Sequence, residues 1–354
     1  MIENPPGQLD QYRLLGRSGL RVSPLALGTM TFGMGGWGTD QQEASRILSH
    51  YIELGGNFID TANFYADGES ERMLGRLVSP NREQLVLATK YSLTMRKGDP
   101  NASGNHRKNM VQAVDASLKR LNTEYIDLFY LHLWDNLTPA EEILRAFDDL
   151  VRAGKILYVG ISDTPAWQIS RLQAIADLRG WSPLVALQIP YNLTERTVER
   201  EFMPMASELG LGILPWSPLA GGVLSGKYTR SDLALKPSQM DSRKNINLAT
   251  GRLTEKALDI AEVVTSIASE LLCSPAQVAL AWTLINKAVT APIMGVRTFA
   301  QLEENIAALS VRFNQDQIDR LQAISKVATC FPHTMIDTPT ADMMFGQVNI
   351  AKRQ

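Results

Sequence analysis

Four side chains of different chemistry stand at or just after short apolar runs of the sequence: Asp60, Tyr65, Lys90 and His132. An aspartate that pairs with a lysine can hold an ammonium near a phenol, and this lowers the phenol pKa from its ordinary value of about 10. A tyrosine tuned in this way can pass a proton, and a histidine beside it can hydrogen-bond a carbonyl oxygen and polarise it. The four residue types therefore predict proton delivery to a carbonyl, provided that the fold brings them together.

The elements that would position them alternate along the chain. Short β-rich runs, such as residues 58–62, 85–90 and 126–132, each precede an amphipathic helical segment. About eight such units follow one another, and the apolar runs are nearly continuous, which is typical of parallel strands covered on both faces. This pattern predicts a (β/α)₈ TIM barrel. A doubly wound sheet is the alternative, but no GxGxxG motif follows the first run.

Barrel enzymes carry their active sites at the carboxyl ends of the strands. Asp60, Lys90 and His132 each end an apolar run, and Tyr65 lies in the loop after Asp60. Each alone also fits an ordinary structural role, such as loop ordering by the aspartate or a satisfied core position for the histidine. Their convergence on one rim favours a catalytic site.

The remaining segments complete one expected domain, residues 1–354, with the barrel spanning about 12–328. Residues 12–22 place Ser-Gly between two apolar runs and predict a β-hairpin that closes the bottom of the barrel. Residues 329–354 form a C-terminal tail, which we expect near the barrel mouth with Phe331 and Phe345.

Composition narrows the class of partner. The chain has 35 basic and 37 acidic side chains, so its net charge of -2 gives no electrostatic case for nucleic acid or a membrane surface. No apolar run approaches the roughly 18 residues of a membrane span, and no secretory signal is visible. Two cysteines are too few for a disulfide framework. We expect a cytoplasmic protein that acts on a small molecule without a metal; the oligomeric state stays open.

The sequence resembles the aldo-keto reductases over nearly its whole length. The resemblance rests on FIDTANFYADGESERMLG, LATK, IDLFYLHLWD, GISD, QIPYNL, PWSPLAGGVLSGKY and MGVRTFAQLEENI. It implies the same TIM barrel, reversible reduction of aldehydes or ketones, and a catalytic tetrad of Asp60, Tyr65, Lys90 and His132 with the tyrosine as proton donor.

The resemblance also implies NADPH/NADP⁺ as cofactor, held without a Rossmann fold. Ser162 and Gln188 would hold the nicotinamide carboxamide, and Trp216 would stack on the ring. Asp163 stands where the commoner family motif has asparagine, and an ionised aspartate accepts but cannot donate a hydrogen bond. Arg297, beside a helix N-terminus, would bind the adenosine 2′-phosphate. The whole expected set is Thr29, Ser162, Asp163, Gln188, Trp216, Ser217, Leu219, Gly221, Lys227, Gly295, Arg297, Gln301, Glu304 and Asn305.

A finer resemblance, carried by NASGNHRKNM, LHLWD, GKILYVGISDTPAW and REFMPMASELGLGILPW, is to the aryl-alcohol dehydrogenase and norsolorinic acid reductase branch. It implies aromatic or other bulky carbonyl substrates. Rim-loop aromatics give the expected pocket wall: Phe32, Trp37, Phe64, Tyr91 and Trp134. Two alternatives remain: a sugar or keto-glycoside oxidoreductase, and a cofactor-binding regulatory subunit like the potassium-channel β subunits, which keep the same tetrad.

Overall fold

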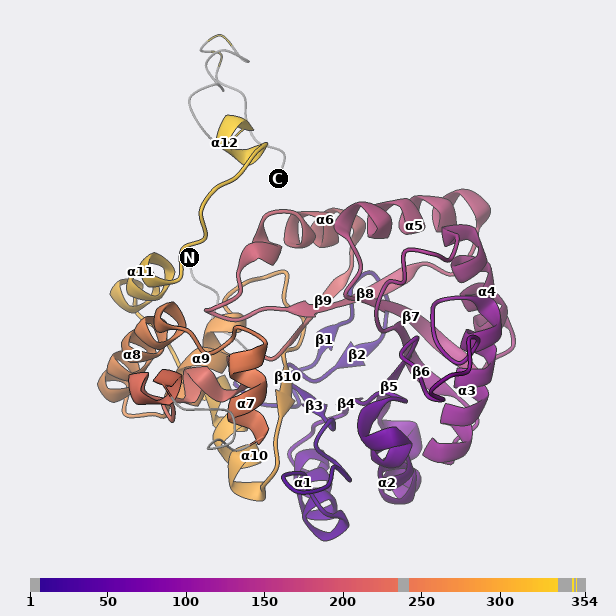
Figure 1. Cartoon of the computed structure of the whole chain (residues 1–354), viewed down its shortest axis with the longest axis horizontal. Coiled ribbons are helices and arrows are strands. Elements are labelled where there is room, and N and C mark those ends of the chain that lie inside the picture. The colour runs from indigo at the N-terminus through magenta and orange to yellow at the C-terminus, as the bar shows by residue number, and fades with distance from the viewer. Residues whose placement is uncertain (1–6, 235–241, 337–345, 347, 349–354) are drawn as a thin grey trace.

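The computed structural model describes residues 7–234, 242–336, 346 and 348. Eight strands pair in parallel in the order β10-β3-β4-β5-β6-β7-β8-β9, and helices surround them (Figure 1). The strands are β3 (Ala26–Gly28), β4 (Phe58–Asp60), β5 (Val86–Tyr91), β6 (Ile126–Leu131), β7 (Ile156–Ser162), β8 (Leu184–Pro190), β9 (Gly212–Trp216) and β10 (Ile293–Gly295). The predicted (β/α)₈ barrel is confirmed.

The seam of the barrel lies between β9 and β10. Residues just ahead of β10 close it: Thr290 N donates to Ile213 O at 2.8 Å, and Val289 forms a parallel bridge with the same residue. Strands β9 and β10 thus meet through the residues just ahead of β10 rather than along its length.

The helices follow the strands in the predicted alternation. The main ones are α1 (Gln41–Glu53), α2 (Glu69–Val78), α3 (Arg107–Leu121), α4 (Ala140–Arg152), α5 (Ala166–Arg179), α6 (Phe202–Leu209), α7 (Ser242–Ala249), α8 (Glu255–Glu270), α9 (Pro275–Thr283), α10 (Phe299–Ile306) and α11 (Gln315–Ile324). Local sequence sets where they begin. Ser274 and Gln277, for example, form a capping box that satisfies free N–H groups at the start of α9.

The predicted hairpin closes the bottom of the barrel. Strands β1 (Arg13–Leu14) and β2 (Arg21–Val22) pair antiparallel, and Leu15 and Val22 are fully buried within the cluster of side chains that fills the barrel. Gly16, directly after Leu15, has a φ of +54°, and a Cβ atom at this position would lie 2.4 Å from Val185 O. A glycine is required at this tight contact.

The chain leaves the barrel after α11 and forms α12 (His333–Ile336) away from it (Figure 1). Arg200 Nη2 donates to Ala328 O at 2.6 Å, so this segment follows the α6 side of the molecule. Phe331 is 80% exposed and does not line the cavity described below, while Phe345 lies outside the described residues. In the described part of the chain no single helix is long and apolar enough to cross a membrane; α8 and α9 pass only as a pair bent by 103°.

Candidate active site

A cavity of about 710 Å³ opens where the barrel strands end. Its wall includes the last residues of four strands: Asp60 of β4, Ser162 of β7, Trp216 of β9 and Gly295 of β10. The cavity therefore lies at the carboxyl rim, where a barrel of this kind carries its reactive groups.

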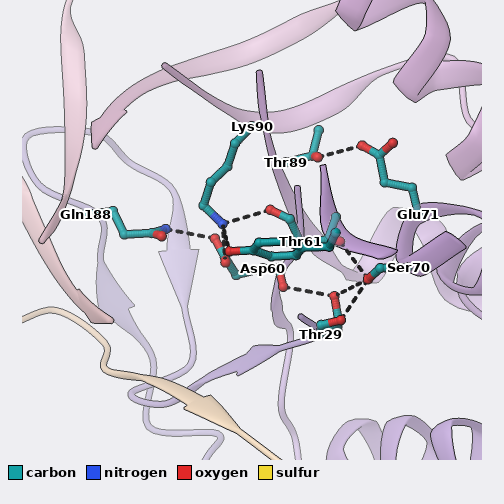
Figure 2. Close-up of polar contacts among 9 residues, drawn as sticks. Thr29, Asp60, Thr61, Ser70, Glu71, Thr89, Lys90 and Gln188 are labelled. Carbon is teal, nitrogen blue, oxygen red and sulfur yellow. Dashed lines mark hydrogen bonds and ion pairs between the residues drawn. The ribbon is translucent and has the colours of Figure 1, made fainter. Parts of the chain in front are cut away.

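The Lys90 side chain is fully buried next to this cavity, and its ammonium has an acceptor for each of its three protons (Figure 2). Nζ lies 2.5 Å from Asp60 Oδ1, 2.8 Å from Thr61 O and 3.3 Å from Tyr65 Oη. Strand register produces this contact: β4 and β5 pair Asp60 with Ala88, so Lys90 stands one inward-facing position further along β5. Three members of the predicted tetrad are thus joined by direct contacts.

Burial and charge act on these groups in opposite directions. Burial lowers the pKa of Lys90, but the Asp60 carboxylate and the Tyr65 phenol outweigh it and raise the pKa above its usual value. Burial raises the pKa of Tyr65, and Lys90 only partly offsets this, so the net shift is upward. The lowering that we predicted from the lysine is present but smaller than the effect of burial. Tyr65 therefore holds its proton at neutral pH, as a proton donor must.

His132 completes the group. Its ring lies edge-on to that of Tyr65, with centroids 6.0 Å apart and planes at 83°. Burial, assisted by the positive charge of Lys90, lowers the pKa of His132 to about 3. The imidazole is therefore neutral at physiological pH, and a neutral imidazole can hydrogen-bond a carbonyl oxygen without itself being an acid of useful strength.

Other polar side chains hold the Asp60–Lys90 pair in place (Figure 2). Gln188 Nε2 donates to Asp60 Oδ2 at 2.9 Å, so both oxygens of this carboxylate have a donor. Below them, Ser70 Oγ lies 3.1 Å from Thr29 Oγ1 and 2.9 Å from Thr61 Oγ1, and it donates to Thr29 O at 2.8 Å. This hydroxyl cluster joins α2 to the ends of β3 and β4, which fixes the carbonyl that Lys90 contacts.

Sequence reasoning missed Thr61 and Ser70. Both lie inside the stretch FIDTANFYADGESERMLG, which also holds Asp60 and Tyr65, so the signal was present in the motif. What the motif does not reveal is that the hydroxyls of a strand end and a helix start meet in space.

Every residue expected to bind cofactor lies on the wall of the cavity. Ser162, Asp163 and Gln188 form a trio with complementary chemistry: the serine hydroxyl can donate, the ionised aspartate accepts, and the amide nitrogen of Gln188 is engaged by Asp60, which leaves its oxygen as an acceptor. A primary carboxamide has two N–H donors and one carbonyl acceptor. The trio therefore fits the carboxamide of a nicotinamide.

A second part of the cavity wall, which we call the cationic end, is lined by Lys227, Arg243, Arg252 and Arg297. Arg252 lies where this part meets Trp216, with its guanidinium 5.7 Å from the ring centre. Burial lowers the pKa of Arg243, and the positive charges of Arg252 and Arg297 lower it further. Among the described residues, none of these three arginines forms an ion pair with an acidic side chain. Guanidinium groups that face one another without carboxylates are suited to an anion such as a phosphate group.

Arg243 and Arg252 were not among the residues expected from the sequence. They lie in α7 and just before α8, in a part of the chain whose sequence shows no clear periodicity. Arg243 Nε approaches Gly221 O at 3.4 Å, and its guanidinium lies 5.6 Å from the centre of the Trp37 ring. The loop after β9 and the loop after β3 thus meet across the cavity.

The expected substrate wall needs correction. Trp37 and Phe64 line the cavity, but Phe32, Tyr91 and Trp134 do not. These three are buried in the layer between the strands and the surrounding helices.

For Tyr91, the only one of the three within a described strand, the reason is the alternation of side chains along β5. Successive side chains of a strand point to opposite faces, so Lys90, which points to the catalytic group, sends Tyr91 outward. Tyr91 stacks on Phe129 at 5.3 Å and donates its hydroxyl hydrogen to Asn105 O at 3.0 Å. Met34 and Leu93 line the cavity, and sequence reasoning did not select them.

Comparison with known proteins gives a consistent picture. A model of the aldo/keto reductase family matches residues 24–326. A norsolorinic acid reductase of Aspergillus flavus is 37% identical over 349 residues, which cover 95% of this chain and 87% of that protein. An uncharacterized oxidoreductase of Bacillus subtilis is 38% identical over 343 residues, or 94% of this chain and 99% of that protein. A relative that carries an aryl-alcohol dehydrogenase name in Saccharomyces cerevisiae is 33% identical over 351 residues, or 95% and 92% of the two chains.

Proposed function

Because this chain belongs to the aldo/keto reductase family, whose members are oxidoreductases that use a nicotinamide cofactor, we propose that it reduces aldehydes or ketones with NADPH. The observation that carries the proposal is the buried Lys90 ammonium, which bridges the Asp60 carboxylate and the Tyr65 phenol at 2.5 and 3.3 Å. An ammonium in this position stabilises the phenolate that remains after the proton has left.

The reaction divides between the cofactor and the chain. A reduced nicotinamide cofactor, when bound, would supply the hydride that the carbonyl carbon receives. Tyr65 delivers its proton to the carbonyl oxygen, and neutral His132 orients that oxygen by a hydrogen bond. Asp60 keeps Lys90 charged, and Lys90 compensates the charge left on Tyr65. Running the same steps backward oxidises an alcohol, so the reaction is reversible.

The preference for NADPH is supported by the cationic end of the cavity. Arg297 follows β10 immediately before α10, and Gln301 Oε1 accepts from its backbone N at 2.9 Å, which ties this turn to the helix. A guanidinium at this point can form a forked pair with a phosphate. NADPH carries a 2′-phosphate that NADH lacks, so Arg297 favours the phosphorylated form.

The preference for aromatic or other bulky carbonyls is supported by the wall and by the relatives. Trp37 and Phe64 present flat apolar faces to the cavity, together with Met34 and Leu93. Several relatives are named norsolorinic acid reductases. We propose a substrate of related bulk without naming the compound.

The test is an assay of the purified protein with NADPH and a panel of carbonyls that includes 4-nitrobenzaldehyde. The loss of reduced cofactor measures turnover. We expect turnover on part of the panel and a loss of at least about 10²-fold in kcat for Tyr65→Phe, since removal of a general acid costs this much or more. NADPH binding without turnover on any carbonyl, in either direction, would contradict the proposal and favour a cofactor-binding regulatory subunit.

A further inference from the structure

Asp163 places a carboxylate on the cavity wall beside Trp216. It directly follows Ser162 at the end of β7 and adopts a left-handed backbone conformation with φ +36°, which is unfavourable for a residue other than glycine. Trp216 Nε1 donates to Asp163 Oδ1 at 3.1 Å. The aspartate thus holds the edge of the indole.

The charged groups around this carboxylate define its state. Burial raises the pKa of Asp163 above its usual value, and the hydrogen bond from Trp216 and the positive charge of Lys90 offset this rise only in part. Lys90 is itself paired with Asp60 at 2.5 Å, so that pair adds little net charge. On the other element that approaches the indole, the Arg252 guanidinium lies 5.7 Å from the ring centre of Trp216. The test below is therefore made at pH 8, well above the ordinary pKa of an aspartate.

We propose that the Asp163 carboxylate makes this protein bind the oxidised nicotinamide cofactor more tightly, relative to the reduced cofactor, than a neutral side chain at this position would. The inference rests on the proposed function, in which the nicotinamide lies against Trp216 with its carboxamide among Ser162, Asp163 and Gln188. It goes further because it assigns Asp163 an effect on the redox balance of the bound cofactor.

The argument is electrostatic. The oxidised nicotinamide ring carries one positive charge, and the reduced ring, which has gained a hydride, carries none. A fixed negative charge beside the ring therefore stabilises the oxidised form alone, whereas hydrogen bonds to the carboxamide act on both forms. Two unit charges several ångströms apart at a partly buried site interact by an amount that corresponds to roughly a tenfold change in affinity after screening.

This preference has a consequence for the direction of the reaction. A site that favours the oxidised ring makes the bound reduced cofactor a stronger hydride donor, and it slows the release of the oxidised cofactor afterwards. Asp163 would thus assist carbonyl reduction on the protein and delay the end of the cycle. In this role it is a positioning and charge-setting residue rather than a group that exchanges protons with substrate.

Asp163→Asn is the matched variant, because asparagine keeps an oxygen that can accept from Trp216 Nε1 and removes only the charge. We would measure the dissociation constants of NADP⁺ and NADPH at pH 8 by quenching of tryptophan fluorescence and by calorimetry. The expected result is that the ratio Kd(NADP⁺)/Kd(NADPH) rises roughly tenfold in the variant. The equilibrium between the two bound forms, measured with excess protein and an alcohol–carbonyl pair, should shift by about 30 mV toward the reduced form.

Glu304→Gln is the control. Glu304 also lines the cavity but belongs to α10, so this variant removes one negative charge from the same cavity on a different element from Asp163 and Trp216. Its two dissociation constants should change by the same factor. Asp163→Ala, which removes the charge and the acceptor together, should show the same tenfold change in the ratio and weaker binding of both forms.

The outcomes separate the two ideas. If both cofactors bind and the ratio is the same in wild type, Asp163→Asn and Asp163→Ala, the role of Asp163 is overturned and the proposed function stands. If neither cofactor binds to the wild-type protein, the proposed function fails first, and the inference fails with it. A ratio that shifts equally in Glu304→Gln would overturn the inference as well, because the effect would then belong to the net charge of the cavity.

Discussion

The two ends of the cavity differ in how their charges are balanced. At the tetrad end, Lys90 meets Asp60 and two further oxygens, so the buried charge is compensated inside the fold. At the cationic end, the positive charges of Arg252 and Arg297 act on Arg243, and no acidic side chain among the described residues pairs with these three arginines. The first arrangement is complete without a ligand, whereas the second is electrostatically unfavourable until an anion arrives.

The elements that position the two groups of side chains also differ. The tetrad comes from the ends of β4, β5 and β6 and one short loop, and these strands are held in register by the whole barrel. The arginines come from α7, the turn before α8 and the turn after β10, which lie at the edge of the barrel. We therefore expect substitutions at the tetrad end to reduce both stability and activity, and substitutions at the cationic end to reduce ligand affinity alone.

The largest expected effect is that of Lys90→Met. This change leaves the Asp60 carboxylate buried at 3% exposure with its ion pair broken. Breaking a buried pair from one side costs about 3–5 kcal/mol of unfolding free energy. Denaturant unfolding at pH 7 measures this loss, and turnover should fall by at least about 10²-fold at the same time.

The double variant Asp60→Asn/Lys90→Met is the control for this result. It removes both charges, so it should recover part of the stability and none of the turnover. If Lys90→Met unfolds at the same denaturant concentration as the wild type, the Asp60–Lys90 ion pair does not stabilise the fold, and this account of the tetrad end is wrong.

A smaller effect is expected at the other end. Arg297→Ala should weaken NADPH binding by about 2 kcal/mol, or roughly thirtyfold, and leave NADH binding and unfolding free energy nearly unchanged. Titration with both cofactors measures the difference. Arg171→Ala is the control, since Arg171 is an exposed arginine paired with Glu141 outside the cavity wall. Equal weakening of NADPH and NADH would sink the assignment of Arg297 to the 2′-phosphate.

His132 offers a pH test of the tetrad end. Its pKa falls from 6.5 to about 3 on folding, so below pH 6.5 the unfolded chain takes up a proton that the folded protein refuses. Its contribution to stability is thus complete above pH 6.5 and is lost progressively as the pH falls toward 3, by at most 1.4 kcal/mol per pH unit. Between pH 7 and 5.5 the wild type should lose about 1 kcal/mol more unfolding free energy than His132→Asn. Parallel losses in the two proteins would contradict the low pKa.

Much of the tetrad end could be predicted from the sequence, because the end of an apolar run marks the end of a strand. Apolar runs that stop at a polar residue predicted Asp60, Lys90 and Ser162 on one rim, and the structure places all three around the cavity region. The prediction failed where a shift of one residue along a strand moves a side chain from the inner to the outer face of the barrel. Lys90 and Tyr91 are neighbours, yet one points to the site and the other into the helix layer, which sequence reasoning did not use.

The cationic end was harder to predict for a different reason. Arg243 and Arg252 have no periodic pattern around them, and their relevance depends on how α7 and the turn before α8 fold over the barrel edge. The pKa of Tyr65 was likewise beyond the sequence, because its direction depends on a competition between burial and a charge 3.3 Å away. Distances and burial, rather than residue types, decide both matters.

The smallest expected effect concerns a third, apolar part of the cavity that neither end controls. Phe64 lines the cavity beside Tyr65 and is 42% exposed. Phe64→Ala should raise KM for a bulky aromatic carbonyl about threefold to fivefold, because about 1 kcal/mol of apolar contact is lost. The dissociation constant of NADPH and the unfolding free energy should hardly change, which steady-state kinetics and fluorescence titration can check. Leu137→Ala, at an 87% exposed position outside the cavity wall, is the control. An unchanged KM in Phe64→Ala would contradict the assignment of Phe64 to the substrate wall.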